Sequence, residues 1–462
     1  MTTQSQGQDT SKMTVGAKLA YGFGDVGASI VTAINGFFLN AFLLEVAGLR
    51  PAMVGTIFLL VKIWDAVNDP LIGALTDRTK SRWGRRRPWL LFGAIPFGLA
   101  FLLHWLVPPL SDMGKFWYYL VVGILLDTGF TVVNVPYTAL TPELAQDYDE
   151  RTTLNSYRFG FSILGGVVAA ALHPVIVGVI VENFGNVVLG NAVSAAIWTF
   201  FLISSSFVAF AFTRENYVAV DTQGPGFFEG LKIAFSNRAF LYVTTIYLLS
   251  WLCIQFVQSN LYLYARYWAD VEDEFPFLVM GVQLSTFVFL LMWDAVSKRI
   301  GKKRVYYYGM AFWVLVSIGL FFVQPGQLAL LLVMATLAGV GVSVAYLIPW
   351  SMLPDVVDLD ELETGQRREG VFYGFFVFLQ KLGVSLGLAV SDYVLDIVGY
   401  INPDVAGEVA IQPPAVQTAL RVFISFVPAV ILLVSIGVVY FYPITRERHA
   451  QIKAELAQRR GD

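Results

Sequence analysis

Stretches of about 20 apolar residues recur along the whole chain, and they decide what it can fold into. A helix of that length crosses the roughly 30 Å hydrocarbon core of a bilayer. Of the 462 residues, 56% are hydrophobic and 14% charged, whereas soluble domains carry roughly 25% charged residues. The stretches are continuously apolar rather than alternating, which excludes a transmembrane β-barrel. The sequence therefore predicts an all-α polytopic membrane protein.

Twelve transmembrane helices fit the pattern. We place them at 18–46, 52–77, 88–108, 114–140, 155–182, 188–212, 240–267, 275–297, 305–323, 327–352, 370–398 and 416–442. Of the 31 Lys and Arg residues, 25 fall on the side of the N-terminus and three in the opposite loops. Because positive residues gather on the cytoplasmic side, both termini are predicted to be cytoplasmic. The expected location is the plasma membrane (the inner membrane of a bacterial cell).

Two loops repeat each other. "DRTKSRWGRRRP" follows span 2 and "DAVSKRIGKKRV" follows span 8, and in each an Asp precedes a Gly by seven residues. This predicts two pseudo-symmetric six-helix bundles, 18–213 and 240–443, the layout of the major facilitator fold. We expect a cytoplasmic linker with an amphipathic helix at 214–239, and cytoplasmic tails at 1–17 and 444–462. The basic loops can also be read as topology anchors alone, but that reading leaves the matched spacing unexplained.

Polar side chains form stripes at helical spacing inside several spans. Ionisable groups at membrane depth cost at least about 2.5 kcal/mol each, so they normally face an interior cavity and are functional. The stripes are Lys62, Asp65 and Asp69 with Asn68 beside them on span 2; Tyr21, Asp25, Ser29 and Thr32 on span 1; Asp127, Thr131, Asn134 and Thr138 on span 4; and Gln255, Ser259, Tyr262 and Arg266 on span 7. Lys381 stands within span 11.

Span 2 carries two carboxylates one helical turn apart. Asp65 and Asp69 repel each other unless a cation lies between them or one is protonated. With Asn68 and Thr131 they form an all-oxygen site of the kind that hard cations prefer, so we predict a cation bound at Asp65 and Asp69, with H⁺ as the open alternative. Lys62 would offset the charge of the empty site. A purely structural Lys62–Asp65 ion pair is the competing interpretation, and it leaves Asp69 unexplained.

The chain resembles the glycoside–pentoside–hexuronide cation symporter family. The resemblance rests on "YGFGD" (21–25), "KIWDAVNDPLIG" (62–73), "SRWGRRRPW" (81–89), "VPYTALTPEL" (135–144), "MLPDVVD" (352–358) and "LQKLG" (379–383), and covers about residues 18–445. It implies a cation-coupled symporter working by alternating access. It also implies that the cation is Na⁺ and that its ligands are Asp65, Asn68, Asp69 and Thr131. Lys381 would face that site, and Arg158 would lie near the substrate.

The departures from the family pattern fall on the sugar side. Ser29 and Asn134 replace sugar-binding carboxylates, and Thr138 replaces a stacking Trp. "FFLNAFLLEVAG" (37–48), "VPYTALT" (135–141) and "PWSMLPDVVD" (349–358) look closer to the sodium-dependent lysophosphatidylcholine symporter branch. The expected substrate is a sugar or glycoside, with a lysolipid as the alternative. The full set of expected substrate-binding residues is Asp25, Ser29, Asp127, Asn134, Thr138, Arg158, Gln255, Tyr262 and Trp350.

Other functions have weaker support. The three histidines are scattered and no Walker A loop occurs, so we expect no enzyme activity, no cofactor and no ATP-driven transport. We also expect no nucleic-acid partner and no obligate protein partner besides the lipid bilayer and the small-molecule substrate. A lipid scramblase or a transporter-like sensor is the alternative from a different class. The acidic run after span 10 reads either as a solvated loop or as gating residues, and the expected gating residues are Asp77, Arg85, Asp294, Asp355 and Asp358.

Overall fold

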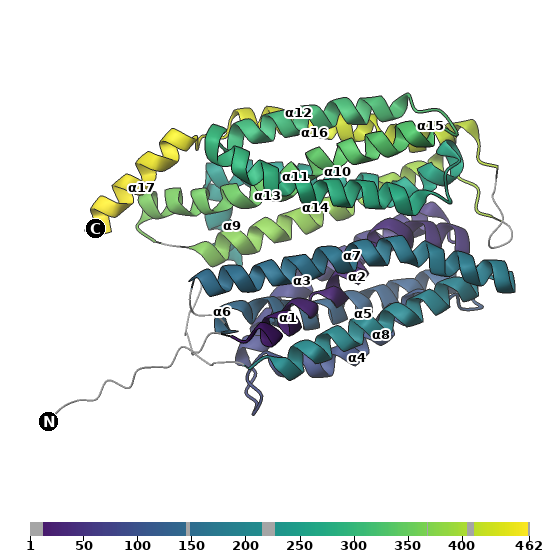
Figure 1. Ribbon diagram of the computed structural model, residues 1–462, viewed down its shortest axis with the longest axis horizontal. Coiled ribbons are helices and arrows are strands. Elements are labelled where there is room, and N and C mark those ends of the chain that lie inside the picture. Colours follow the sequence, from purple (N-terminus) through teal and green to yellow (C-terminus); the bar gives the residue numbers. More distant parts are fainter. Residues whose placement is uncertain (1–12, 145–147, 215–226, 367, 404–410, 461–462) are drawn as a thin grey trace.

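The structure is a computed structural model that describes residues 13–144, 148–214, 227–366, 368–403 and 411–460. All regular elements in these ranges are helical, and twelve helices are long and apolar enough to cross a membrane, as predicted. Figure 1 shows them running side by side in two groups, with the first and last parts of the chain at the same end. We call that end the terminal side and the opposite end the distal side.

The N-terminal group holds α1 to α8. Its elements are α1 (Val15–Phe23), α2 (Val26–Ile34), the π-helical turns η1 (Asn35–Leu39) and η2 (Phe42–Val46), α3 (Pro51–Arg78), α4 (Arg87–His104), α5 (Asp112–Ala139), α6 (Thr141–Leu144), α7 (Tyr148–Phe184) and α8 (Val187–Phe212). Polar caps begin several of them: Ser111 accepts a hydrogen bond from Gly114 N–H at the start of α5, and Asn186 accepts one from Leu189 N–H at the start of α8.

The C-terminal group follows the short helix α9 (Phe227–Ser236), which falls in the predicted linker and contacts α10 and α14. Its elements are α10 (Arg238–Tyr264), η3 (Ala265–Ala269), α11 (Phe275–Ile300), α12 (Lys302–Phe321), α13 (Leu328–Thr364), α14 (Glu369–Ile397), α15 (Pro414–Ile424), α16 (Phe426–Tyr440) and the terminal α17 (Arg446–Arg460).

Several of the predicted spans differ from the structure, and the first is broken between α1 and α2. Span 10 was expected to end at 352, but α13 continues to Thr364, so the acidic run is helical and the loop interpretation is wrong. The helix continues because its carboxylates are paired: Arg368 donates to both oxygens of Asp360, at 2.9 and 2.6 Å. It ends at Gly365, whose positive φ of 72° favours glycine. The last span is broken at Ser425 into α15 and α16.

The repeated loops share a backbone feature that explains their spacing. Gly84 has φ = 100° and Gly301 has φ = 89°, a region that side chains with a Cβ rarely adopt. Each glycine precedes the helix that starts the next crossing, α4 or α12. The matched glycine therefore reflects the same chain reversal in both halves.

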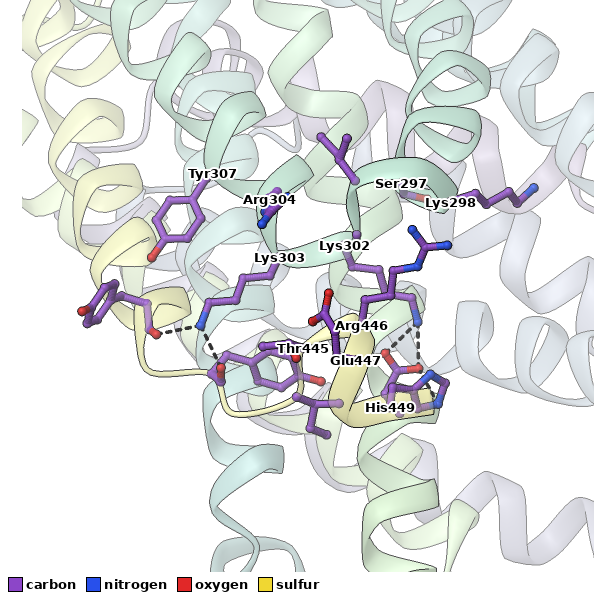
Figure 2. A pocket seen from close by; sticks show the side chains of 16 residues that line it. Ser297, Lys298, Lys302, Lys303, Arg304, Tyr307, Thr445, Arg446, Glu447 and His449 are labelled. Atoms are coloured by element: carbon purple, nitrogen blue, oxygen red, sulfur yellow. Dashed lines mark hydrogen bonds and ion pairs between the residues drawn. The ribbon is translucent and has the colours of Figure 1, made fainter. Parts of the chain in front are cut away.

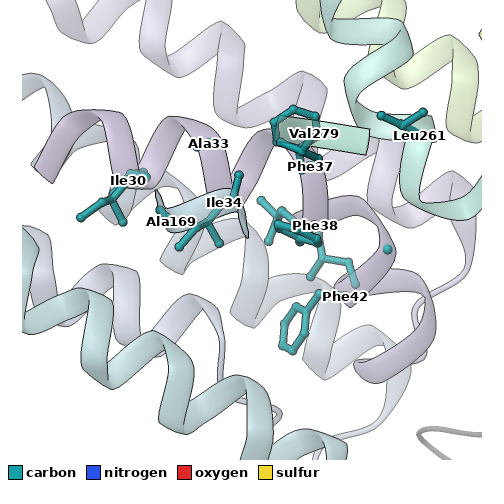
Figure 3. Close-up of a cluster of buried hydrophobic side chains, with 14 of the residues drawn as sticks. Ile30, Ala33, Ile34, Phe37, Phe38, Phe42, Ala169, Leu261 and Val279 are labelled. Atoms are coloured by element: carbon teal, nitrogen blue, oxygen red, sulfur yellow. The ribbon is translucent and has the colours of Figure 1, made fainter. Parts of the chain in front are cut away.

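The halves meet on the distal side through an apolar core. Phe37 and Phe38 of η1 both contact the Phe275 ring of α11, and Phe38 also contacts Tyr262 of α10. Figure 3 shows this part of η1 beside Leu261 and Val279 of the other half. Among helix pairs, α3 with α14, α7 with α11, and α10 with η1 form the main contacts between the halves.

Polar bonds reinforce the distal contact. Arg266 lies 3.0 Å from the Glu45 carboxylate, and the Tyr400 hydroxyl donates to the same carboxylate at 3.3 Å. Asn40 Nδ2 donates to Asp392 Oδ1 at 3.0 Å. Each of these bonds joins the N-terminal half to the C-terminal half, and we call this set the distal contacts.

Close helix packing predicts a strong effect at Gly339 on α13. A Cβ there would clash with Ser285 Oγ and lie 2.6 Å from the Val282 carbonyl oxygen on α11. Gly339→Val should lower the stability by about 1–3 kcal/mol through overpacking, measured by thermal unfolding in detergent. Gly437→Val is the control, because no atom lies within 4 Å of the added Cβ. Equal losses in both variants would contradict the packing described for α11 and α13.

Candidate cation and substrate site

Three helices from both halves bring the charged residues of spans 2, 4 and 11 together. α3 packs against α5 within the N-terminal half and against α14 of the C-terminal half. Lys62, Asp65 and Asp69 recur at helical spacing along α3 and meet α5 and α14 there. Asp127 and Thr131 come from α5, and Lys381 comes from α14. We call these six residues, with Asn68, the charged cluster.

The centre of the cluster is Lys381. Its ammonium nitrogen lies 2.8 Å from Asp65 Oδ1 and 2.5 Å from Asp69 Oδ2. The cation expected between the two carboxylates is thus, in this structure, the side chain of Lys381. These bonds also join the two halves in the middle of the bundle, since α3 and α14 belong to different halves.

Lys62 and Thr131 form further bonds with the carboxylates of the cluster. Lys62 Nζ lies 3.1 Å from Asp65 Oδ2 and 3.1 Å from Asp127 Oδ1. Thr131 Oγ1 donates to Asp69 Oδ1 at 2.8 Å. The Lys62–Asp65 pair of the competing interpretation is therefore present, but it accounts for only one of the four carboxylate oxygens of Asp65 and Asp69. Asp127, expected at the substrate site, here contacts Lys62.

Part of the cluster is buried, and its formal charges do not cancel. Asp65 is 2% exposed and Thr131 is 1% exposed, whereas the side chains of Lys62, Asp69 and Lys381 are 37%, 29% and 22% exposed. Three carboxylates face two ammonium groups, so one negative charge is in excess. Asn68 Nδ2 and Asp127 Oδ2 are buried polar atoms that lack a hydrogen-bond partner in the part of the chain that the structure describes. Unsatisfied buried groups are costly. The unpaired Asp127 oxygen is an acceptor that suits a nearby cation, whereas the Asn68 N–H group is a donor that a cation would not satisfy.

No three His, Cys, Asp or Glu side chains among the described residues are arranged to hold a metal ion. A cation at this cluster would therefore rely on the Asp65 and Asp69 carboxylates together with neutral oxygens. The Thr131 hydroxyl already donates a hydrogen bond to Asp69, and Asn68 directly precedes Asp69 on α3. Hard monovalent cations are compatible with such a mixed set of oxygens.

A second polar group lies at the break between α1 and α2 and on α5, α6 and α7. Arg158 Nε is 3.5 Å from Asp25 Oδ2, so these two expected substrate residues meet as an ion pair. The Tyr21 hydroxyl shares a 2.5 Å hydrogen bond with Thr141 Oγ1, and the Tyr137 hydroxyl donates to the Tyr21 carbonyl. Of the remaining expected substrate residues in this half, Ser29 and Thr138 donate to carbonyls of their own helices, and Asn134 is half-buried on α5.

The expected substrate residues of the C-terminal half are separated. Trp350 on α13 is 40% exposed, and its indole N–H donates to the Tyr247 hydroxyl at 3.1 Å within a group of rings that includes Phe376. Gln255 is half-buried on α10. Tyr262 instead donates to Glu272 Oε1 at 2.6 Å, beside the distal contacts. The structure thus places Tyr262 on the distal side, away from Trp350.

The expected gating residues lie on the terminal side. Asp355 accepts from Lys302 at 2.7 Å, and His449 of α17 lies 3.2 Å from Asp358. Asp294 pairs with Lys298 of its own helix, at 2.6 Å. Arg85 lies in the loop before α4, and the side chain of Asp77 lies outside the described residues. These three pairs, Lys302–Asp355, His449–Asp358 and Lys298–Asp294, lie within the C-terminal half.

Sequence reasoning missed several members of the distal contacts. Asn40, Glu45, Asp392 and Tyr400 were not assigned any role. Asp392 is 1% exposed and stands in the apolar stretch "GLAVSDYVLDI" of α14, so the argument that singled out Lys381 on the same helix applies equally to it.

Comparison with known proteins decides the family. The chain matches MFS/sugar transport proteins over residues 20–446. The chain belongs to this family. It is 39% identical to an uncharacterized symporter of Synechocystis sp., covering 98% of this chain and 99% of that protein. It is also 30% identical to sodium-dependent lysophosphatidylcholine symporter 1-A of Danio rerio, covering 94% of this chain and 87% of that protein.

Solved structures share the fold of this family member. A bacterial homologue of the human lysosomal transporter Spinster, in an inward-facing and occupied conformation, has a TM-score of 0.68 at 13% identity, over 92% of this chain and 95% of that chain. The nucleoside transporter NupG has a TM-score of 0.61 at 13% identity, over 93% of this chain and 99% of that chain. These likenesses establish the major facilitator fold.

The bridging position of Lys381 predicts a large stability effect. Lys381→Met removes the cation from between Asp65 and Asp69 and should cost about 3 kcal/mol, because it leaves buried carboxylates uncompensated. Unfolding of the purified protein in sodium-free buffer measures this loss. Lys298→Met is the matched control: its side chain is 72% exposed, so losing its pair with Asp294 should cost less than about 1 kcal/mol. A loss for Lys381→Met no larger than the control would contradict the bridge.

Proposed function

We propose that this protein is a sodium-coupled secondary active symporter. The observation that carries the proposal is the Lys381 ammonium held between the Asp65 and Asp69 carboxylates. A pair of acidic side chains at membrane depth that needs a cation between them can exchange one cation for another. Na⁺ entering from solution would take the place of the Lys381 ammonium, using both carboxylates, the Thr131 hydroxyl and the Asn68 amide oxygen as ligands.

This exchange supplies a coupling mechanism. Lys381 belongs to the C-terminal half and its two partners belong to the N-terminal half, so ion binding would break bonds between the halves. A ligand shifts a conformational equilibrium only by its difference in affinity for the two states. Na⁺ would favour the state in which Lys381 has moved away, and the substrate would then bind to that state more tightly. A proton on Asp69 would release Lys381 in the same way, which is why Na⁺ and H⁺ must be compared experimentally.

The proposed direction of transport rests on the distribution of Lys and Arg and on the distal contacts between the halves. The excess of Lys and Arg on the terminal side supports a cytoplasmic location for that side, in the plasma membrane. The distal contacts then close the outer side, whereas the terminal-side pairs Lys302–Asp355 and Lys18–Glu150 each stay within one half. We therefore assign the structure to an inward-facing state of an importer.

A lysophospholipid or similar amphiphile is the proposed substrate. Relatives named as sodium-dependent lysophosphatidylcholine symporters align with nearly all of this chain. Ser29 and Asn134 offer neutral groups in place of carboxylates that would hold sugar hydroxyls, and Thr138 stands in place of a stacking Trp. Arg158 supplies a cation that suits a phosphate. A glycoside is the second candidate, because the exposed Trp350 ring could stack on a sugar face and the family description names sugar transport.

Uptake into proteoliposomes tests coupling and substrate together. Wild-type protein should accumulate lysophosphatidylcholine, offered beside a panel of glycosides, only under an inward sodium gradient. Asp69→Asn should abolish that accumulation, because it removes one of the two charged ligands. Asp112→Asn, an exposed carboxyl in the first turn of α5, is the control and should transport normally.

Three results would contradict the proposal. Accumulation by Asp69→Asn at the wild-type level would remove the cation site. Lipid equilibration that is independent of any gradient would indicate a scramblase. Accumulation driven by a proton gradient without sodium would assign the same carboxylates to H⁺.

The distal contacts predict how the conformational equilibrium can be shifted toward an open distal side. Combining Glu45→Gln with Arg266→Gln removes a buried ion pair between the halves, so the distal side should open more often. The reporter is Phe37→Cys in a Cys253→Ala background, since Phe37 is buried between the halves and Cys253 is the sole native cysteine. Maleimide labelling of that cysteine should become about fivefold faster, a shift worth roughly 1 kcal/mol.

Arg50→Gln is the control for this experiment. Arg50 also pairs across the halves, with Asp396 at 3.6 Å, but its side chain is 68% exposed and the pair should contribute little. Unchanged labelling in the double variant would show that the Glu45–Arg266 pair does not hold the distal side closed. An equal increase for Arg50→Gln would show that the effect is not specific to the buried Glu45–Arg266 pair.

A further inference from the structure

A cavity of about 500 Å³ lies on the terminal side of the C-terminal half, apart from the charged cluster. It is bounded by the end of α11, the start of α12, the segment after α16 and the start of α17. Figure 2 shows Lys302, Lys303 and Arg304 approaching from α12 and Arg446, Glu447 and His449 from α17. Neither the transport site nor the distal contacts use this cavity.

The charges around the cavity are unbalanced. Five cationic side chains line it, and two carboxylates: the cations are Lys298, Lys302, Lys303, Arg304 and Arg446, and the carboxylates are Asp355 and Glu447. Lys302 is engaged by Asp355 at 2.7 Å. The pKa of the exposed Glu447 carboxyl is lowered, first by its own backbone N–H and by the Thr445 hydroxyl, and further by Arg304 and Arg446. Glu447 is therefore ionised, and the lining still carries a net positive charge.

Two of the cations are held by neutral acceptors. Lys303 Nζ donates to the carbonyl oxygens of Tyr440 at 2.8 Å and Tyr442 at 2.9 Å. Arg446 Nη1 donates to the Arg299 carbonyl oxygen at 2.7 Å. These bonds position the ammonium and guanidinium groups at the cavity without cancelling their charge. Positive groups fixed in this way are prepared to bind an anion.

A buried hydroxyl gives an independent indication of a ligand. Tyr442 is 2% exposed and lines the cavity, and its hydroxyl has no hydrogen-bond partner in the described part of the chain. Burial raises the pKa of this phenol well above its ordinary value, so the hydroxyl keeps its proton. An unpaired buried donor is costly, and an acceptor oxygen in the cavity would satisfy it.

The surroundings favour a lipid as the source of that acceptor. Tyr440 and Phe441, at the end of α16, are 68% and 64% exposed, and Tyr308 on α12 is 61% exposed. Aromatic side chains at the ends of membrane-spanning helices mark the level of the lipid headgroups. Basic pockets at that level, on the side where Lys and Arg gather, suit anionic headgroups.

We propose that this cavity binds the phosphate of an anionic phospholipid from the leaflet on the terminal side, through Lys303, Arg304, Arg446 and the Tyr442 hydroxyl. Lys302 joins the cavity to Asp355 of α13, and His449 joins α17 to Asp358 of the same helix. A bound lipid therefore contacts the start of α12 and the start of α17, and through them the terminal end of α13.

Native mass spectrometry of the purified full chain tests the proposal. The probes are phosphatidylglycerol, phosphatidylcholine with the same acyl chains, and inorganic phosphate as a competitor. Wild-type protein should retain phosphatidylglycerol in preference to phosphatidylcholine, and inorganic phosphate should not displace it. Combining Lys303→Gln with Arg446→Gln should weaken phosphatidylglycerol retention by about tenfold, the loss expected for two charge-assisted contacts.

The matched control removes the same charge elsewhere on α17. Arg448 and Lys453 do not line the cavity, and Arg448 pairs with Glu455 of its own helix. Combining Arg448→Gln with Lys453→Gln should leave retention unchanged. Tyr442→Phe keeps every charge and the ring, and should weaken retention as well, so the proposal remains testable if the double variant fails to fold.

Three outcomes would overturn the proposal. Equal retention of the two lipids would show that no anionic site exists. An equal loss in the control variant would show non-specific attraction to a basic surface. Displacement of phosphatidylglycerol by inorganic phosphate at the same concentration would show a site for the free anion rather than for a lipid.

Discussion

The structure depends on an ammonium group held between two carboxylates in the middle of the bundle. Asp65 and Asp69 are one helical turn apart on α3, and without a cation between them their carboxylates would repel each other. Lys381 supplies that cation from the other half of the protein, at 2.8 and 2.5 Å. The same contact therefore solves an electrostatic problem and joins the two halves. A bond that must be present in one state and exchanged in another is a means of coupling ion binding to movement.

The remaining inter-half contacts are distributed unevenly along the bundle. On the distal side, aromatic packing around Phe37 and Phe38 and the buried Glu45–Arg266 pair join the halves. On the terminal side, the pairs made by Lys302 and Arg368 remain within the C-terminal half. In the proposed mechanism, ions and substrate would reach the charged cluster from the terminal side. The basic cavity at the start of α12 lies apart from the charged cluster, at the level of the lipid headgroups.

Much of this could be predicted from the sequence because polar groups are costly inside a membrane, so those that are retained there usually have a function. Twelve apolar stretches gave the number of crossings, and the cost of burying Lys62, Asp65 and Asp69 indicated the cluster. The repeated Asp-to-Gly spacing predicted equivalent loops, and Gly84 and Gly301 share a positive φ for that reason. Helical periodicity shows which residues share a face but not which neighbour that face meets. For this reason Asp127 was expected at the substrate and lies against Lys62, and the bond between Asn40 and Asp392, which are 352 residues apart, was not foreseen.

An experimental structure at saturating sodium, compared with one in sodium-free buffer, tests the exchange of Lys381 for Na⁺ most directly. We expect the ion between Asp65 and Asp69, with Thr131 and Asn68 completing its shell and the Lys381 ammonium no longer within hydrogen-bonding distance of Asp69. Lys381 should return to the bridging position when sodium is absent. A map that shows Lys381 still bridging both carboxylates at saturating sodium would contradict the exchange and, with it, the proposed basis of coupling.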